Sequence, residues 1–146
     1  MGKSNHFRRN YLTVAQQSYF MRAEFPDFRP VTNRGNWISW TGPLTPSPLS
    51  TTYTVQISYE VPTRPEITIL SPALTPRPDF KKIPHVFAGN KPCVHQAHEW
   101  SGDSILAHTI VPWLSAWLYF YEVWYFTGLW LGEGTHPDLP QHRSAS

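Results

Sequence analysis

Cysteine is almost absent from this sequence of 146 residues, in which Cys93 stands alone. One cysteine excludes a disulfide within the chain. The opening residues also lack the apolar stretch of a signal peptide, so we expect a reducing, cytoplasmic location. In that compartment a lone cysteine is either a small core residue or a nucleophile, which makes this thiol the first candidate for chemistry.

Charge is also scarce, since only 15% of the residues are charged and the net charge is +2. The Lys and Arg residues are scattered, without the clustered stripe that a nucleic-acid site needs, so we expect no nucleic-acid partner. Hydrophobic residues reach 40%, which is enough for a packed core. We expect one domain over residues 1–146, with a core at about 8–132 and a polar tail at 133–146.

Aromatic residues and prolines are abundant instead, with 7 Trp, 7 Tyr, 8 Phe and 15 Pro. Large rings fill a small core efficiently, whereas prolines impose turns and extended connections. Residues 8–24 predict a helix, because their apolar positions gather on one face. Pro26 and Pro30 are expected to end it.

The middle third predicts an antiparallel meander. Residues 36–40 resemble a short strand, and the Pro-rich stretch 41–50 is interpreted as a loop. The clearest strand is 51–60, where large apolar residues alternate with polar ones. Ile67 and Ile69 indicate a third strand after Pro65. Short connections between these segments favour antiparallel pairing.

From Leu70 to Glu99 the regular pattern stops, since five prolines exclude a continuous helix or central strand. This stretch holds the single cysteine and three of the seven histidines, namely His85, His95 and His98. Long irregular segments in a small domain are usually functional or disordered. The chemistry-bearing residues favour a functional loop.

Residues 104–131 are strongly apolar and predict a long helix that begins near Pro112 and ends at Gly128. A membrane span over 109–131 is an alternative, because only Glu122 is charged there. Aromatic rings spread along the whole segment, and the strands need a covering helix, so a core helix is preferred and no membrane contact is expected. The predicted fold class is α+β: an antiparallel sheet of about four strands flanked by an N-terminal and a long C-terminal helix.

The irregular stretch contains an ordered set of motifs: Pro84-His85, the pair Val86-Phe87, the turn Gly89-Asn90, then Cys93 and Trp100-Ser101. This order resembles the active-site stretch of ubiquitin-conjugating enzymes. In that family a His-Pro-Asn tripeptide, a hydrophobic-aromatic pair and a Gly-containing turn precede the thioester cysteine, and a Trp follows. The order of predicted helices and strands agrees with that family over about residues 8–132.

The resemblance implies a ubiquitin-conjugating-enzyme-like fold and a cysteine acyltransferase in which Cys93 carries a thioester. The chain departs from the family at His85, which stands where the tripeptide has Asn. That Asn orders the loop and helps the oxyanion, and an imidazole can donate a hydrogen bond in either role. His95 and His98 are further candidates for proton transfer, proposed from their proximity to Cys93 alone.

The C-terminal half is similar to the bacterial members of this superfamily, which are found in antiviral cyclic-oligonucleotide signalling (CBASS) operons. The similarity rests on residues 110–114, 117–118, 121–124 and 127–130. It implies that the donor C-terminus belongs to a cGAS-like nucleotidyltransferase or a ubiquitin-like protein, and that the target supplies an amine. A separate activating enzyme, docking at Arg8 and Arg9, is also implied. No cofactor is expected.

Three other interpretations stay open. The chain could be a non-catalytic binding module of the same fold that holds and regulates a partner nucleotidyltransferase. Cys93 could be a buried structural thiol. The spacing Cys93-x-His95-x-x-His98, with His85 as a fourth ligand, could also bind zinc, although no metal site is the preferred expectation.

Overall fold

A computed structural model describes residues 10–32 and 35–132 of the chain. Two helices, six strands and two short 3-10 turns form within these residues. In chain order they are α2 (Val14–Glu24), β1 (Arg29–Thr32), β2 (Trp37–Leu44), β3 (Tyr53–Glu60), β4 (Glu66–Ser71), β5 (Val86–Phe87), β6 (Lys91–Pro92), η1 (Ala97–Glu99), η2 (Leu106–His108) and α3 (Ile110–Thr127).

Within the described residues, β1 to β4 form an antiparallel sheet in the order β1-β2-β3-β4, which is the predicted meander. Strand β3 is central, and Ile57 lies opposite Trp40 on β2 and Ile67 on β4. Its odd-numbered side chains, from Tyr53 to Tyr59, are buried. The alternation therefore sends one face of β3 into the core, as the sequence predicted.

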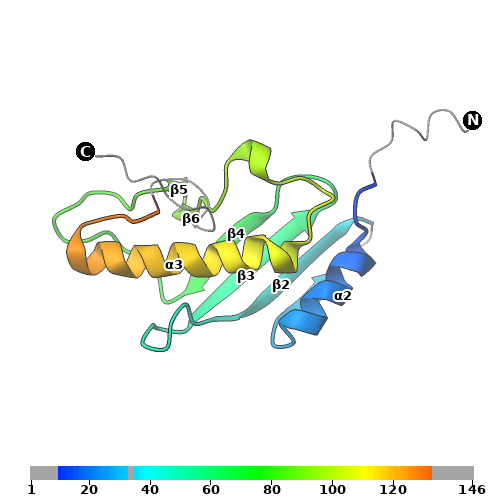
Figure 1. Cartoon of the computed structure of the whole chain (residues 1–146), viewed down its shortest axis with the longest axis horizontal. Coiled ribbons are helices and arrows are strands. Elements are labelled where there is room, and N and C mark those ends of the chain that lie inside the picture. The colour runs from blue at the N-terminus through cyan, green and yellow to red at the C-terminus, as the bar shows by residue number, and fades with distance from the viewer. Residues whose placement is uncertain (1–9, 33–34, 133–146) are drawn as a thin grey trace, which may run out of the picture.

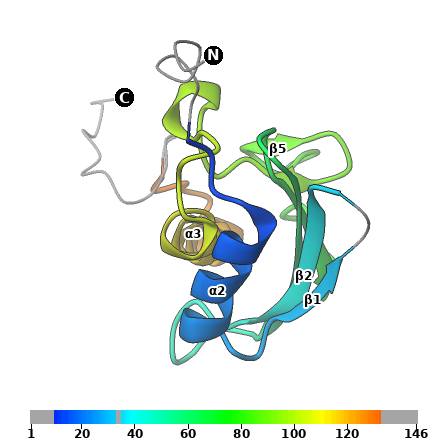
Figure 2. The ribbon, with the colours of Figure 1, turned by 90° about the vertical axis from the view of Figure 1, so that its right-hand side faces the viewer.

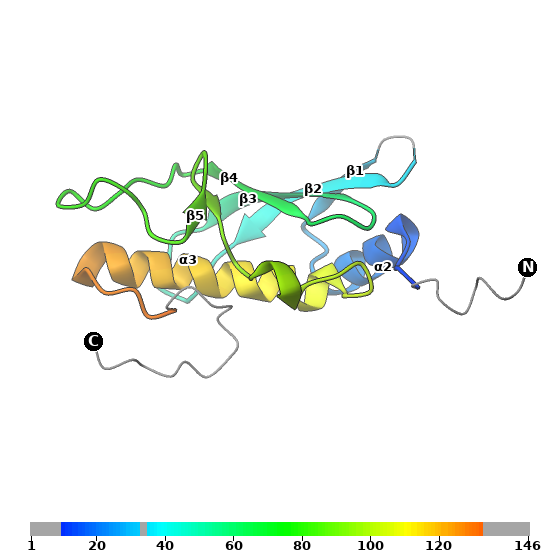
Figure 3. The ribbon, with the colours of Figure 1, turned by 90° about the horizontal axis from the view of Figure 1, so that it is seen from above.

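Both helices lie on one side of the sheet, so the described residues form one layer of strands and one layer of helices (Figures 2 and 3). The long helix α3 crosses the sheet, and α2 packs beside its N-terminal end (Figure 1). The buried Gln17 joins α2 to the segment before α3: its side chain donates to the carbonyl of Ser104 at 2.8 Å and accepts from the N–H of Leu106 at 2.9 Å. The α+β prediction is thereby confirmed.

Helix α2 begins later than the predicted residue 8. Thr13 caps it with a capping box, in which its hydroxyl accepts from the N–H of Gln16 at 3.1 Å and the Gln16 side chain accepts from the N–H of Thr13 at 2.9 Å. Residues 10–13 are not helical, and 8–9 lie outside the described residues. The capping box satisfies the first backbone donors, which fixes the start of the helix.

Two proline positions correct the sequence predictions. Pro30 does not simply end a helix but lies in β1, at the edge of the sheet, where a missing N–H is tolerated. Strand β2 continues to Leu44 through Pro43, so 41–44 is not part of a loop. Beyond Thr41, β2 pairs with β3 alone, and this one-sided pairing accommodates Pro43.

Helix α3 agrees with its prediction at both ends. Pro112 lies in the first turn, where no backbone donor is needed. Gly128 has φ 84°, and its N–H bonds the carbonyl of Trp124 at 2.7 Å, which stops the helix in the left-handed conformation that glycine favours. In the described ranges, no helix has both the length and the hydropathy that crossing a bilayer requires.

The segment between β4 and α3 is largely irregular, as predicted, but it contains the short β5–β6 hairpin that the sequence did not predict. Its turn at residues 88–90 includes Gly89 and Asn90, both with positive φ. These are the residue types that enter this conformation at low cost. The predicted tail at 133–146 and the predicted docking residues Arg8 and Arg9 lie outside the described residues.

Candidate active site

Cys93 directly follows β6 and is half-buried. Its backbone N–H donates to the carbonyl of His85 at 3.0 Å. Its thiol lies 3.7 Å from the carbonyl oxygen of His95, to which it donates. Contacts with two backbone carbonyls therefore position Cys93, and its residue is partly rather than fully buried.

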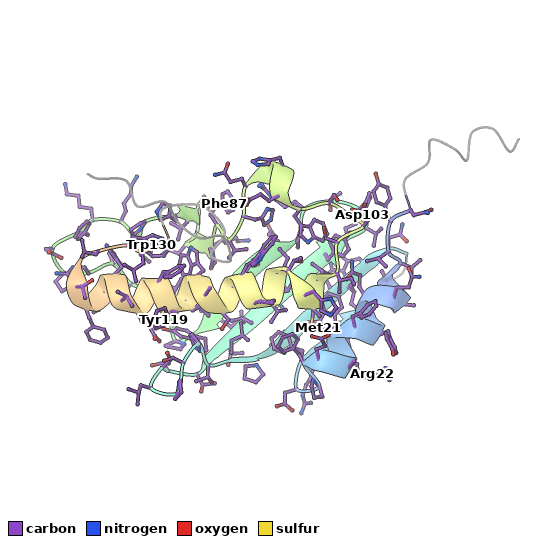
Figure 4. The ribbon with its side chains drawn as sticks, viewed as in Figure 1. Met21, Arg22, Phe87, Asp103, Tyr119 and Trp130 are labelled. Carbon is purple, nitrogen blue, oxygen red and sulfur yellow. The ribbon has the colours of Figure 1, made fainter. Side chains whose placement is uncertain are left out.

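The carbonyl oxygen of His85 accepts two hydrogen bonds that connect this segment. That oxygen accepts from Cys93 and also from the indole N–H of Trp117 on α3, at 3.1 Å. The imidazole packs against Trp130, with ring centroids 5.0 Å apart. Figure 4 shows Trp130 and Phe87 on the same side of α3. The long helix thus holds the segment that contains Cys93.

The backbone of His85 has φ 55°, a left-handed conformation. Among residues other than glycine, Asn, Asp and His are the types enriched there. His85 is therefore a residue type that tolerates this backbone, as Asn would be.

His95 is buried, with only 6% of its surface exposed, and its ring lies 6.0 Å from that of Trp113. Its Nδ1 is 2.7 Å from the carbonyl oxygen of Gln96. A carbonyl can only accept, so Nδ1 carries the proton and Nε2 is the basic nitrogen of the neutral ring. This bond fixes the orientation and the tautomer of the neutral imidazole.

His98 differs from the buried His95 in its exposure to solvent. It is exposed on the short turn η1, which Gln96 begins by donating its N–H to the Glu99 carboxylate at 2.7 Å. Within the part of the chain that the structure describes, no three His, Cys, Asp or Glu side chains converge as metal ligands. The zinc interpretation of the Cys93 segment is therefore not supported.

A groove of about 360 Å³ lies between β4 and the β5–β6 hairpin, and Pro92 and Val94, the chain neighbours of Cys93, line it. Arg64 borders it, with its guanidinium carbon 5.3 Å from the centre of the Phe87 ring. Lys91 is 3.4 Å from a carboxylate oxygen of Glu66 across the same groove. The lining is otherwise mainly apolar and comprises Pro65, Ile67, Ala88, Pro92, Val94 and His95.

A second hollow, of about 280 Å³, shares Arg64 and His95 with this groove and reaches Trp100 and Ser101. The His95 ring therefore borders two adjoining spaces. One runs along β4 and the hairpin, and the other opens beside the turn between β3 and β4.

Burial is the main influence on the Cys93 thiol and raises its pKa, and the negative charge of Glu99 acts in the same direction. The positive charge of Arg64 opposes both effects, but the pKa stays above the ordinary value. At neutral pH the sulfur is therefore mostly a thiol, and its thiolate forms as the pH rises.

Sequence reasoning missed three of the residues that shape this site. Trp117 and Trp130 position His85, yet in the sequence Trp117 is one of several aromatic residues suited to a core. Arg64 lies 29 residues before Cys93 and approaches it only through the fold. No local spacing signals such a contact.

The family comparison agrees with the family that the sequence resembles. The model of the family described as Type II CBASS E2 protein matches residues 17–137, which include the sheet, the Cys93 segment and α3. No curated protein matches the chain. The family match indicates a role in CBASS antiphage defence alongside other proteins of the CBASS operon. This chain belongs to the family of Type II CBASS E2 proteins.

Proposed function

We propose that this chain is a ubiquitin-conjugating-like acyl carrier that accepts the C-terminal glycine of a donor protein as a thioester on Cys93 and passes it to an amine. The donor is a cGAS-like nucleotidyltransferase or a ubiquitin-like protein of the operon. One observation carries the proposal: in a chain of the CBASS E2 family, the single cysteine is half-buried and held by hydrogen bonds to two backbone carbonyls, between two residues that line a groove.

Charging is a thioester exchange. The Cys93 thiolate attacks the carbonyl carbon of the donor's C-terminal thioester on a separate activating enzyme. A new C–S bond forms to Cys93, the old C–S bond breaks, and the released thiolate of the activating enzyme takes up a proton. The raised pKa of Cys93 limits the thiolate at neutral pH, so charging should accelerate with pH.

The groove lined by Pro92 and Val94, the chain neighbours of Cys93, is where we expect the last residues of the donor to lie. Its apolar lining suits an extended chain with small side chains, and Arg64 and Lys91 at its border can bind carbonyl oxygens of that chain. Binding there holds the thioester carbonyl near the sulfur, and this positioning lowers the entropic cost of the transfer.

Transfer to the target is an aminolysis. The amine attacks the thioester carbonyl, a C–N bond forms, and the C–S bond breaks to release Cys93. The ring of His85 is our candidate for stabilising the oxyanion, and Nε2 of His95 for accepting the proton of the amine. His98 is the second candidate acceptor, because its exposed ring can meet a target amine at the surface.

The test is the intact mass of the chain, purified without reductant after co-expression with its operon neighbours. We expect an adduct with the mass of the donor that a thiol reagent removes. Because the chain has one cysteine, a thiol-reversible adduct on it can only be attached to Cys93. Cys93→Ser should give a thiol-resistant oxyester, and Cys93→Ala should give no adduct.

Two results together would contradict the proposal. The wild-type chain would co-purify with the nucleotidyltransferase but have no adduct, and the Cys93→Ala variant would still give full antiphage protection. These results would favour the non-catalytic binding module. Within the catalytic mechanism, His95→Gln should slow discharge onto an amine and leave charging intact. The same behaviour in His98→Gln instead would transfer the acceptor role to His98.

A further inference from the structure

Helix α3 has a second face with the features of a binding surface, turned away from the Cys93 segment. The charge of Glu122 is the only one along the helix, and it lies about 140° around the axis from Trp117, since each residue advances a helix by about 100°. Figure 1 shows the β2–β3 connection on this side of α3, with β5 and β6 on the other. Figure 4 places Tyr119 on the same side as that connection, opposite Phe87.

Two hollows meet at Glu122. One, of about 310 Å³, lies between α3 and the segment after β4, and the other, of about 630 Å³, lies between α3 and the β2–β3 connection. Leu49 and Phe126 border both hollows and are 98% and 82% exposed. We call Leu49, Tyr119, Glu122, Tyr125 and Phe126 the Glu122 surface.

Hydrogen bonds fix the carboxylate of Glu122, but among the described residues no cationic side chain pairs with it. The hydroxyls of Ser50 and Tyr53 donate to its two oxygens at 2.6 and 2.7 Å. A carboxylate offers about four acceptor positions, so about two stay available. In the described ranges, no Lys, Arg or His side chain forms an ion pair with Glu122, and no other charged side chain lines the two hollows.

The surroundings of this carboxylate favour a cation. Burial and the hydrogen bond to Glu122 raise the pKa of Tyr53, so its hydroxyl remains a neutral donor. A half-buried negative charge among aromatic rings lacks full hydration, and a cationic hydrogen-bond donor stabilises it strongly. The exposed apolar side chains beside it are typical of a protein-binding surface.

We propose that the Glu122 surface binds an arginine side chain of a partner protein, with apolar residues on either side of that arginine. A guanidinium offers paired donors to the open positions of a carboxylate and stacks on aromatic faces, which suits Tyr125 and Phe126. The flanking apolar residues would cover Leu49 and Tyr119. Such a contact anchors a partner across α3 from Cys93 and takes no part in acyl transfer.

The experiment titrates the full-length chain with acetyl-leucyl-arginyl-leucinamide and follows backbone amides by two-dimensional NMR. We expect saturable shifts at residues 49–53, 72–75 and 119–126. The citrulline peptide, which has a neutral group of the same shape, should bind about tenfold more weakly, the loss expected for a charged hydrogen bond. The lysine peptide should bind between the two.

Three variants complete the design. Glu122→Gln keeps the size of the side chain and should weaken binding about tenfold, for the same loss of a charged hydrogen bond. Leu49→Ser should weaken it less, and because that side chain is almost fully exposed, the fold is retained. Glu60→Gln removes an exposed carboxylate at the end of β3 and should change nothing.

Equal affinity for the arginine and citrulline peptides, or for wild type and Glu122→Gln, would overturn the proposal. The same holds for an absence of saturable shifts at these amides. Shifts at these residues that grow with protein concentration alone would assign the surface to a second copy of the chain. None of these readouts involves Cys93, so they are independent of the proposed thioester chemistry.

Discussion

The sheet and the Cys93 segment are held in different ways. Strands β1 to β4 are joined by backbone ladders that repeat along their length. Residues 72–109 are fixed to the helices at isolated points by side-chain hydrogen bonds. These include Tyr121 with Thr75, Trp117 with His85, Arg77 with the carbonyls of Trp124 and Tyr125, and Gln17 with Ser104 and Leu106.

Because of this difference, we expect the sheet to determine the stability of the molecule and the isolated contacts to determine the position of the Cys93 segment. A ladder distributes its free energy over many bonds, so a core substitution in the sheet should affect the whole molecule. A single side-chain donor holds one short segment, so its loss should move that segment and leave the sheet folded. Substitutions in the two regions can test this contrast.

The largest effect is expected from Ile57→Ala in β3, whose side chain is fully buried. Removing it leaves a cavity in the centre of the sheet and should lower the free energy of unfolding by about 3 kcal/mol. Chemical denaturation followed by circular dichroism measures the change. Gln56→Ala, on the other face of the same strand, should cost less than about 1 kcal/mol. Similar losses for both variants would contradict the placement of the core.

Trp117→Phe removes the indole donor to His85 and part of a buried ring, and should cost about 2 kcal/mol. The Cys93 segment should loosen, and the half-buried thiol should react several-fold faster with iodoacetamide. Trp124→Phe is the matched control, because Trp124 is equally buried on α3 and its ring packs against Phe80, Tyr121 and Tyr125. If both variants changed the alkylation rate alike, the specific role of Trp117 would be lost.

Tyr121→Phe tests the contact of α3 with Thr75 and should lower the free energy of unfolding less than Trp117→Phe does. Its hydroxyl accepts from the N–H of Thr75 at 3.0 Å and donates to the carbonyl of Thr75 at 2.8 Å. Thr75 is exposed, so water can replace these bonds, and the loss should be about 1 kcal/mol. Hydrogen exchange should increase at residues 73–80 and not in β2 or β3. Faster exchange throughout the sheet would show that the segment and the sheet unfold together.

Arg64→Gln should change stability by less than about 0.5 kcal/mol, because Arg64 is exposed. Its effect should appear in the pH profile of Cys93 alkylation. Burial already raises the pKa of this thiol, and losing the positive charge of Arg64 should raise it further. The profile should move to higher pH, with a slower reaction at pH 8.

Lys91→Gln serves as the control, since it removes a cation whose nearest partner is Glu66. An unchanged profile in Arg64→Gln would show that Arg64 does not influence the thiol.

The raised pKa of Cys93 also predicts how the free energy of unfolding depends on pH. A raised pKa in the folded state means that the thiol contributes stability below the pKa of the unfolded chain, about 8.5. That contribution is lost as the pH rises through the folded pKa.

The sequence predicted the elements whose signals are local. The alternation of β3, the proline and glycine at the ends of α3, and the turn at Gly89 and Asn90 are set by neighbouring residues, and the structure contains all of them. The start of α2 also had a local signal, the capping box of Thr13 and Gln16, which the periodicity alone did not reveal.

Predictions that depended on the position of a strand in the sheet were wrong. Pro30 and Pro43 have the same local chemistry in a strand as in a loop, and only the absence of a neighbouring strand makes them acceptable. The site shows the same limit. From the sequence, a role for the imidazole of His85 could be predicted. The two hydrogen bonds to its carbonyl oxygen could not, because every residue has such an oxygen.

The position of Pro30 at the sheet margin also bears on solubility. An exposed edge strand is a template for another chain, and edge-to-edge addition of strands is a common route to aggregation. Pro30 has no N–H to offer such a partner on β1, and at the opposite margin β6 lies against β4. Both margins of the sheet therefore resist extension, which would help the protein remain dispersed at high concentration.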